Sequence, residues 1–95
     1  MSGAKFDEGK VRFDLLLPEW ELAVAKVMTH GAGVHGDNSW QTVPNGENRY
    51  YAALRRHLNA FRSGEELDKE SGLPHLAHVA VNAMFLMTLF EMGKD

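Results

Sequence analysis

The sequence predicts an all-α protein with three main helices and a long loop between the first two, packed as a homo-oligomeric helical bundle. Two of its apolar segments begin near a proline and all three are followed by a glycine, as is usual at helix ends. Apolar residues recur at helical spacing within the segments. The last segment is apolar on nearly every side, so one neighbouring helix cannot cover it.

The first helix is expected over residues 18–29. Pro18 suits a first helical turn, where its missing N–H costs nothing, and Gly31 is expected to end the helix. Residues 31–46 then form the long loop, because glycine, asparagine, aspartate and proline are frequent there. Such a loop in a small domain is usually functional or packed on itself, and Trp40 is expected to anchor it.

The second helix is expected over residues 47–62, and the third from residues 71–74 to about Met92, with Pro74 in its first turn. The second helix carries one apolar stripe, made of Tyr51, Leu54, Leu58 and Phe61. Because a monomer with three helices would leave part of the third helix in water, we expect a homodimer or a tetramer.

The 95 residues form one expected domain, residues 1–95, with an irregular N-terminal segment over residues 1–17. The hydrophobic content of 44% and the charged content of 24% are those of a globular protein. The chain has no cysteine, which excludes a disulfide, a thiolate zinc site and a cysteine nucleophile. No signal peptide is evident, and residues 76–92 look too polar and slightly too short for a membrane span, so a cytoplasmic location is expected.

The formal net charge of −3 gives no general attraction to a nucleic acid polymer or to an anionic membrane. Its distribution is uneven. Residues 47–62 carry four arginines against one acid, and residues 63–72 carry four acids against one lysine. A positive and a negative patch are therefore expected side by side.

Three polar residues share one face of the third predicted helix. His75, His78 and Asn82 are spaced i, i+3 and i+7 on an otherwise apolar helix. Burying them without partners costs free energy. They form a site, find hydrogen-bond partners in the core, or lie on a face that is simply exposed.

Glu65 and Asp68, spaced i, i+3, are candidate metal ligands. Carboxylate oxygens suit Mg²⁺ or Mn²⁺, and added imidazoles shift the preference towards Mn²⁺ or a later transition metal. The alternative is a solvated acidic turn.

Arg55 and Arg56, beside His57, are candidate phosphate contacts, because a guanidinium group matches phosphate oxygens. The alternative is that these arginines pair with the acids of the following loop. In the long loop, Asn38 and Trp40 are candidate nucleotide contacts, and Trp40 could also stack on a base. Neither a P-loop nor a dinucleotide-binding fingerprint is present.

These features occur in an order that resembles a known family. The matching elements are Gly9-Lys10, Asp14, Leu17-Pro18, Gly31-Ala32, His35-Gly36-Asp37-Asn38-Ser39-Trp40, Ala53-Leu54-Arg55-Arg56-His57-Leu58, Gly64-Glu65-Glu66-Leu67-Asp68, Glu70-Ser71-Gly72, His75-Leu76-Ala77-His78 and Asn82. Together they resemble the short, mostly phage-encoded proteins described as the N-terminal domain of dATP/dGTP diphosphohydrolases. These look distantly like the all-α, MazG-type nucleotide pyrophosphohydrolases.

The resemblance implies hydrolysis of purine deoxynucleoside triphosphates to monophosphate and pyrophosphate, with a divalent metal ion, Mg²⁺ or Mn²⁺, as cofactor. The expected metal ligands are Glu65, Asp68, His75 and His78, of which Glu65, Asp68 and His78 are also the expected catalytic residues. The expected substrate contacts are Lys10, Asn38, Trp40, Arg55, Arg56, His57 and Asn82. The expected location is the host cytoplasm, and the expected partners are a nucleotide and further copies of the chain, without nucleic acid polymer or membrane.

One departure from the MazG pattern matters. Those enzymes carry ExxE on one helix and ExxD on the next, whereas here only Glu65 to Asp68 fits ExxD, in a turn between glycines. A four-carboxylate magnesium site therefore cannot be transferred to this chain. Two alternatives stay open: a non-catalytic viral nucleotide-binding module that sequesters a nucleotide signal, and a helical assembly protein without a small ligand.

Overall fold

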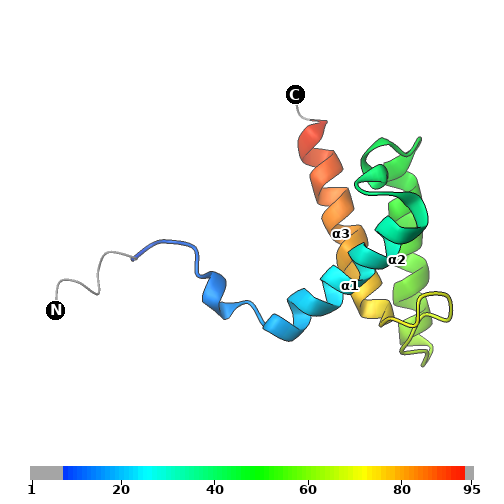
Figure 1. The fold of residues 1–95 in the computed structure, drawn as a ribbon, viewed down its shortest axis with the longest axis horizontal. Helices are drawn as coiled ribbons and strands as arrows, with labels where there is room; N and C mark the ends of the chain where they lie inside the picture. The colour runs from blue at the N-terminus through cyan, green and yellow to red at the C-terminus, as the bar shows by residue number, and fades with distance from the viewer. Residues whose placement is uncertain (1–7, 94–95) are drawn as a thin grey trace.

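The computed structural model describes residues 8–93 and consists of three α-helices and two short 3-10 helices (Figure 1). In chain order they are η2 (Phe13–Leu15), α1 (Pro18–His35), η3 (Ser39–Thr42), α2 (Gly46–Arg62) and α3 (His75–Met92). Within these described residues the strand-like pairing is limited to one isolated bridge, between Leu67 and Pro74. The predicted all-α class with three main helices is confirmed.

α1 is longer than predicted, because Gly31 does not end it. The helix continues through Gly31 and Gly33, where glycine costs only about 1 kcal/mol each relative to alanine. It ends at Gly36, which adopts a φ of 96° and donates its N–H to the carbonyl oxygen of Ala32 at 2.8 Å. A left-handed backbone of this kind favours glycine, so Gly36 is the helix stop. The predicted long loop shortens to residues 36–45.

Trp40 anchors this shortened loop, as expected. Its ring stacks on Phe85 of α3 with a centroid separation of 4.3 Å and an interplanar angle of 12°. The hydroxyl of Tyr50 in α2 donates to the carbonyl oxygen of Trp40 at 2.7 Å. The loop is thereby fixed against both α2 and α3.

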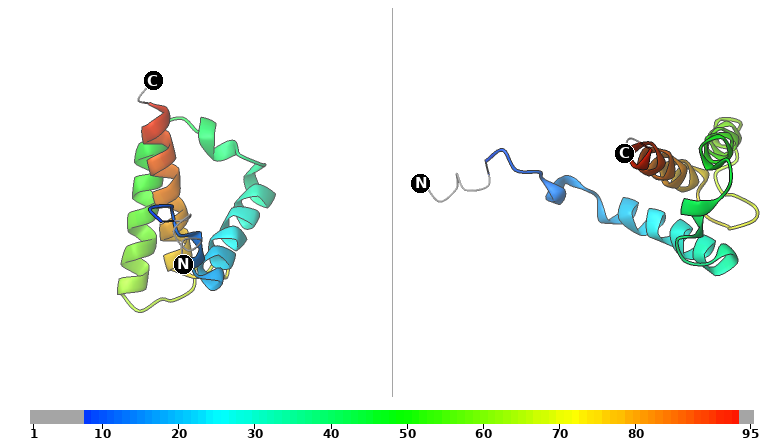
Figure 2. Two further views of the ribbon diagram at one scale, coloured as in Figure 1. Left: turned by 90° about the vertical axis from the view of Figure 1, so that its left-hand side faces the viewer. Right: turned by 90° about the horizontal axis from the view of Figure 1, so that it is seen from above.

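α2 and α3 run antiparallel and side by side, joined by the loop over residues 63–74 (Figures 1 and 2). α3 begins at His75, later than predicted, because Pro74 has a ψ of 134° and precedes the helix instead of lying in its first turn. The predicted apolar stripe of α2 is not its core face, since Tyr51, Leu58 and Phe61 are exposed. The side that α2 turns towards α3 carries Tyr50 and His57 instead.

The hydrophobic core is small and lies where α1 crosses the first half of α3. Its buried members are Val27 of α1 and Ala77 and Val81 of α3. The described part of the N-terminal segment, residues 8–17, leads away from the helices and is irregular except for η2 (Figures 1 and 2). The radius of gyration of 16.5 Å exceeds the roughly 12 Å expected for a compact chain of this length. Sixteen large hydrophobic side chains of the described residues are exposed, so much apolar surface is left uncovered.

Among the described residues, α3 alone is long and apolar enough to cross a membrane. Its 18 residues have a mean hydropathy of 1.2, so the expectation of a too short and too polar stretch is not met. One such helix is weak support for a span, because central helices of soluble proteins have the same length and composition. The first half of α3 also carries three buried polar side chains, those of His75, His78 and Asn82.

Candidate functional site

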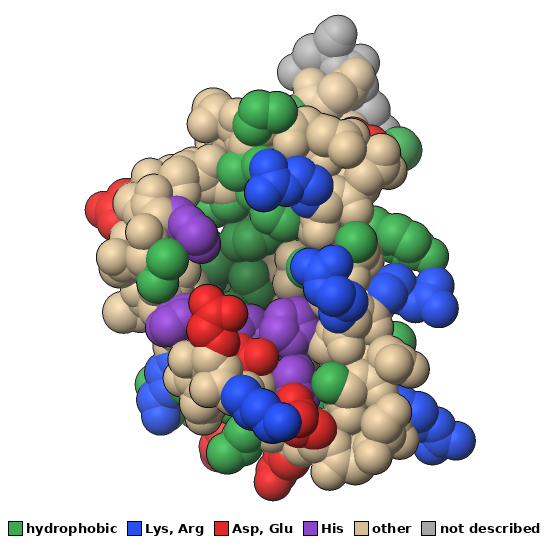
Figure 3. Space-filling view, turned by 90° about the vertical axis from the view of Figure 1, so that its right-hand side faces the viewer, with side chains coloured by type: hydrophobic (Ala, Val, Ile, Leu, Met, Phe, Trp, Pro, Cys, Tyr) green, Lys and Arg blue, Asp and Glu red, His purple; other side chains and the backbone are tan. Residues whose placement is uncertain are grey.

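A cavity of about 1180 Å³ lies between α1, η3, α2 and α3. Figure 3 shows it as a hollow with a hydrophobic floor in its upper part and with histidine and acidic side chains gathered below, while basic side chains lie along one side. The aromatic part of the lining comes from Trp40, Tyr50 and Phe85. The polar part combines arginines of α2 with histidines of α1, α2 and α3 and with carboxylates of the two connecting loops.

The loop between α2 and α3 holds its acidic residues by backbone hydrogen bonds. The amide of Asp68 donates to the carbonyl of Leu73, and the amide of Gly72 donates to the carbonyl of Asp68, each at 2.8 Å. The amide of Ser71 donates to the Asp68 carboxylate oxygen Oδ2 at 2.9 Å. Asp68 and Ser71 are thus held in fixed positions.

Three imidazole rings meet beside this loop. Nδ1 of His57 in α2 lies 2.8 Å from Nδ1 of His75 in α3, and the ring of His57 stacks on that of His78 at 4.3 Å and 7°. His75 and His78 are buried, with 3% and 9% of their surfaces exposed. Sequence reasoning placed His75 and His78 on one face of α3, and the structure adds His57 from the neighbouring helix.

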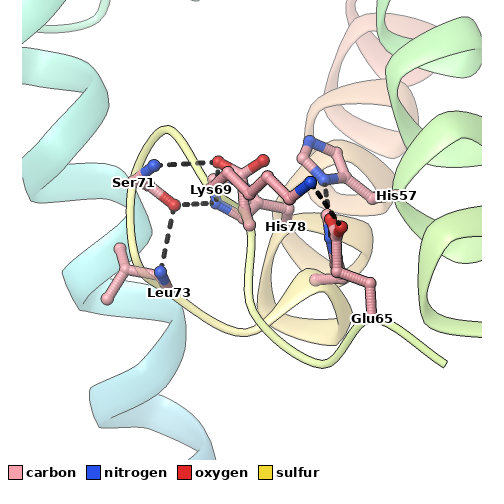
Figure 4. A network of polar contacts seen from close by, with 8 residues as sticks. His57, Glu65, Lys69, Ser71, Leu73 and His78 are labelled. Atoms are coloured by element: carbon pink, nitrogen blue, oxygen red, sulfur yellow. Dashed lines mark hydrogen bonds and ion pairs between the residues drawn. The ribbon is translucent and has the colours of Figure 1, made fainter.

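Glu65 holds the inner histidine. Its Oε1 lies 2.6 Å from Nε2 of His75, and Oε2 lies 3.7 Å from the ammonium group of Lys69 (Figure 4). Because a carboxylate only accepts hydrogen bonds, Nε2 of His75 carries the proton. In a neutral His75 the Nδ1 atom is then a lone-pair acceptor, and Nδ1–H of His57 donates to it.

His78 is held by Ser71 and by the charge of Asp68. Its Nε2 lies 2.7 Å from the Ser71 hydroxyl oxygen and 3.8 Å from Oδ2 of Asp68 (Figure 4). The Ser71 oxygen also accepts the backbone N–H of Leu73 at 3.1 Å. The serine therefore links the loop backbone to the histidine, and sequence reasoning did not single it out.

The electrostatics of this cluster favour neutral imidazoles beside ionised carboxylates. Burial lowers the pKa of His57 and of His78, and in His78 this outweighs the nearby charge of Asp68. The hydrogen bond from His75 lowers the pKa of Glu65. Burial acts to raise the pKa of Asp68. The hydrogen bonds from Ser71 and the electrostatic effect of His78 and His57 outweigh burial, so this pKa is lowered too.

One group of three side chains in the described part of the chain lies close enough together that it could hold a metal ion. His57, Asp68 and His75 each offer one ligand atom, and these atoms all lie within 4.8 Å of one another. The set differs from the predicted ligands, because His57 enters it while Glu65 and His78 do not. Glu65 and His75 also lie behind the pocket instead of in its lining, whereas Asp68 and His78 line it.

The arginines of α2 divide between two sides of the helix. Arg49 and Arg56 line the pocket, and within residues 8–93 neither pairs with an acidic side chain. Arg55 lies outside the pocket lining, where its guanidinium donates to the Tyr51 hydroxyl at 2.7 Å. The predicted substrate contact at Arg55 is therefore not at the pocket, because adjacent residues point about 100° apart on a helix. Among the ion pairs of residues 8–93, the alternative pairing of these arginines with the loop acids does not occur.

The other predicted substrate contacts also divide into residues that line the pocket and residues that do not. Asn38, Trp40, His57 and Asn82 line the pocket, and the Asn82 side chain donates to the carbonyl of His78 at 2.8 Å. Lys10 lies on the extended N-terminal segment and does not line the pocket. Sequence reasoning missed Arg49, although its position seven residues before Arg56 places both on one face of α2.

The fold and the site define a small all-α domain with a histidine–carboxylate cluster at the base of an arginine-lined pocket. The chain belongs to the family described as dATP/dGTP diphosphohydrolase, N-terminal, whose model matches residues 1–95. It is also 35% identical over 91 residues to a dATP/dGTP diphosphohydrolase of Salmonella phage PMBT28. The match covers 96% of this chain but only 31% of that protein, so the chain spans about a third of its relative. No solved structure matches the chain.

Proposed function

We propose that this domain binds a purine deoxynucleoside triphosphate in the pocket and hydrolyses it to the monophosphate and pyrophosphate. The observation that carries the proposal is the meeting of two arginines with a histidine–carboxylate cluster across one cavity. The relative from Salmonella phage PMBT28 is named for dATP and dGTP, and this name supports the nucleotide class.

Arg49 and Arg56 are the proposed phosphate contacts. They stand two helical turns apart on the pocket side of α2, so both guanidinium groups can reach one triphosphate chain. Within the described residues no acidic side chain neutralises them. Guanidinium groups form paired hydrogen bonds with phosphate oxygens, and their charge would hold the leaving pyrophosphate.

The aromatic side of the pocket is the proposed base site. Trp40, Tyr50 and Phe85 form a contiguous aromatic group there. The indole Nε1–H of Trp40 is buried, and no hydrogen-bond partner for it occurs in the part of the chain that the structure describes. A purine ring nitrogen would satisfy this donor, whose burial without a partner otherwise costs free energy.

Hydrolysis is proposed at the polar base of the pocket. The water oxygen bonds to the α-phosphorus, the bond from that phosphorus to the bridging oxygen breaks, and pyrophosphate leaves. His78 takes up the proton that the water releases, because its lowered pKa keeps the imidazole neutral at pH 7. Asp68 orients the water through its ionised carboxylate. A divalent metal ion bound at this position would supply Lewis-acid stabilisation of the phosphate charge.

The second candidate function is nucleotide binding without hydrolysis. The departure from a four-carboxylate metal site favours it, and the same arginines and aromatic side chains would serve it. In this case the polar cluster maintains the shape of the pocket and performs no chemistry.

The test is to incubate the purified chain with dGTP and dATP, with and without Mn²⁺, and to measure pyrophosphate release and the melting temperature. We expect pyrophosphate, and a loss of rate of about 100-fold or more in His78→Ala. Arg56→Gln should lower the apparent affinity, whereas Arg62→Gln, which removes the same charge outside the pocket lining, should change neither quantity.

The other results of this test would support nucleotide binding without hydrolysis or rule out a nucleotide function. Nucleotides that raise the melting temperature without being hydrolysed would support the binding module. No thermal shift with any nucleotide would rule out both candidates and leave a helical assembly protein.

We also propose that the chain associates with further copies of itself. The chain buries only three hydrophobic residues but exposes sixteen large hydrophobic side chains in its described part. Several of these, including Leu76, Met87 and Met92, follow one another along α3. An exposed apolar surface of this extent usually marks an interface.

A further inference from the structure

We infer that His57, Asp68 and His75 form a binding site for one first-row transition-metal ion, and that Glu65 positions His75 without touching the ion. The inference deepens the proposed function, because it names the ion class and the ligand residues beside the same pocket, two of which, His57 and Asp68, line it. Only the use of the ion in hydrolysis depends on the proposed function. Binding of the ion itself can be measured without any nucleotide.

The first support is the convergence of the ligand atoms. One atom from each of the three residues lies within 4.8 Å of the other two. We assign the Nδ1 nitrogens of His57 and His75 as two of the ligand atoms, because they face each other at 2.8 Å. Nitrogens that share an ion at about 2.1 Å stand roughly 3.0–3.4 Å apart, so a shift of a few tenths of an ångström admits the ion. His57 is only partly buried and can make this shift, whereas His75 is fixed in the core.

The second support is the position of Glu65. Histidines that bind metals almost always donate their other ring N–H to a carboxylate, carbonyl or water, which fixes the tautomer. Nε2 of His75 donates to Glu65 at 2.6 Å, and this leaves Nδ1 unprotonated and directed at His57. The second oxygen of Glu65 faces Lys69 at 3.7 Å. Both carboxylate oxygens therefore have partners, so the sequence-based assignment of Glu65 as a ligand is replaced by a positioning role.

The third support is the chemistry of the donor set. Two imidazole nitrogens and one carboxylate suit Mn²⁺, Co²⁺ or Zn²⁺, whereas Mg²⁺ prefers oxygen ligands and keeps several waters. Nδ1 of His57 carries the proton of the hydrogen bond to His75, so this ring has to change tautomer before it can bind the ion. The proton between the two Nδ1 atoms moves to Nε2 of His57 when that ring changes tautomer. This leaves both Nδ1 atoms with a lone pair for the ion.

The test is a titration of the chelator-treated 95-residue chain with Co²⁺, followed by its visible absorption, and with Mn²⁺ or Mg²⁺, followed by calorimetry. We expect one ion per chain, a visible Co²⁺ band typical of nitrogen and oxygen ligands, and tighter binding of Mn²⁺ than of Mg²⁺. Circular dichroism on each variant confirms that the helices are formed.

The variants separate ligands from other histidines. His57→Gln and Asp68→Asn should abolish the band, and both residues are partly exposed, so the fold should survive. His35→Gln is the matched control, because His35 lies at the end of α1 outside the three-residue set. Absence of a bound ion, or an unchanged affinity in His57→Gln, would overturn the inference and leave an ordinary hydrogen-bonded histidine pair.

Glu65→Gln tests the positioning role. The band should persist while the affinity falls by about 10–100-fold, the usual effect of removing a carboxylate behind a metal-binding histidine. If Glu65→Gln loses the band completely, as His57→Gln does, then Glu65 is a ligand and the assignment is wrong. An ion that binds as expected without any hydrolysis of dGTP would sink the proposed function and leave this inference standing. If His57→Gln still hydrolyses dGTP with Mg²⁺, the proposed function stands and this inference is wrong.

Discussion

The two halves of α3 invert the usual relation between polarity and burial. Residues 75–82 include all the buried residues of the helix, and three of them are polar: His75, His78 and Asn82. Residues 83–92 include no buried residue, although most of them are apolar; Met87 and Met92, for example, are 66% and 52% exposed. One continuous helix thus has a buried polar half and an exposed apolar half.

The difference lies in the neighbours of each half. The first half is crossed by α1 and flanked by the ordered loop over residues 63–74, whose side chains satisfy its histidines. The second half meets α2 and the Trp40 loop along one side only. The chain thus provides partners for the buried polar groups of the first half and leaves the apolar surface of the second half exposed, which is the surface of the proposed self-association.

The largest expected effect is a loss of stability when a charge is placed in the first half of α3 but not in the second. Val81→Asp places a carboxylate at a position that is 3% exposed among apolar neighbours, and should lower the free energy of unfolding by about 4 kcal/mol or more. Met87→Asp makes the same chemical change at an exposed position and should leave the unfolding of the monomer within about 0.5 kcal/mol of the original. Urea denaturation at low protein concentration measures both, and equal losses would contradict the comparison.

The next effect concerns the polar half. Ser71→Ala removes the partner of both His78 Nε2 and the Leu73 amide. Leaving these buried groups unsatisfied should cost about 2 kcal/mol of stability. Thermal unfolding of Ser71→Ala beside Ser63→Ala, an exposed serine at the end of α2, provides the measurement and its control. A Ser71→Ala protein as stable as the control would mean that water replaces the hydroxyl.

A smaller effect is expected on self-association when a charge is placed in the apolar second half of α3. Met87→Asp should weaken self-association by about 1.4 kcal/mol, or tenfold in the dissociation constant, because a charge would enter the covered surface. Sedimentation velocity over a range of concentrations measures the shift. Lys26→Asp, a charge change on α1 instead of α3, serves as control. A monomer at all concentrations would refute self-association.

The smallest effect is a pH dependence of the polar half. The pKa values of His57 and His78 are lowered in the folded state, so the unfolded state binds more protons below about pH 6.5. The stability is therefore complete above pH 6.5 and falls as the pH drops below it, with a further loss below about pH 4.5, where the carboxylates protonate. Denaturation at pH 7.5, 6.5 and 5.5 should show the first loss, and His57→Gln/His78→Gln should flatten it. Stability that rises on acidification would exclude this account.

Sequence patterns predicted the parts of this molecule that depend on local spacing. The polar face of His75, His78 and Asn82 follows from helical periodicity, and the anchoring of Trp40 follows from its position in a glycine-rich loop. The helix stop was wrong by five residues, at Gly31 instead of Gly36, because any of three glycines fits the pattern. Only the backbone conformation identifies the one that ends the helix.

The parts that sequence did not predict depend on how α2 is rotated about its axis. His57 and Arg49 face the cluster and the pocket, while the apolar Tyr51, Leu58 and Phe61 face outwards. A hydrophobic pattern favours the opposite rotation. The position of Glu65 behind His75 likewise depends on the course of the intervening loop, which no spacing rule describes. The residue types of the site were therefore foreseeable, but their division into residues that line the pocket and residues that lie behind it was not.

The stacked indole of Trp40 provides a built-in optical reporter for the pocket. The chain has two tryptophans, and Trp20 is 50% exposed on the first turn of α1, away from the cavity lining. In a Trp20→Phe background, the fluorescence would come from Trp40 alone, whose Nε1–H would gain its first hydrogen bond when a ligand enters. Occupancy of the cavity could then be followed in real time, without a labelled nucleotide.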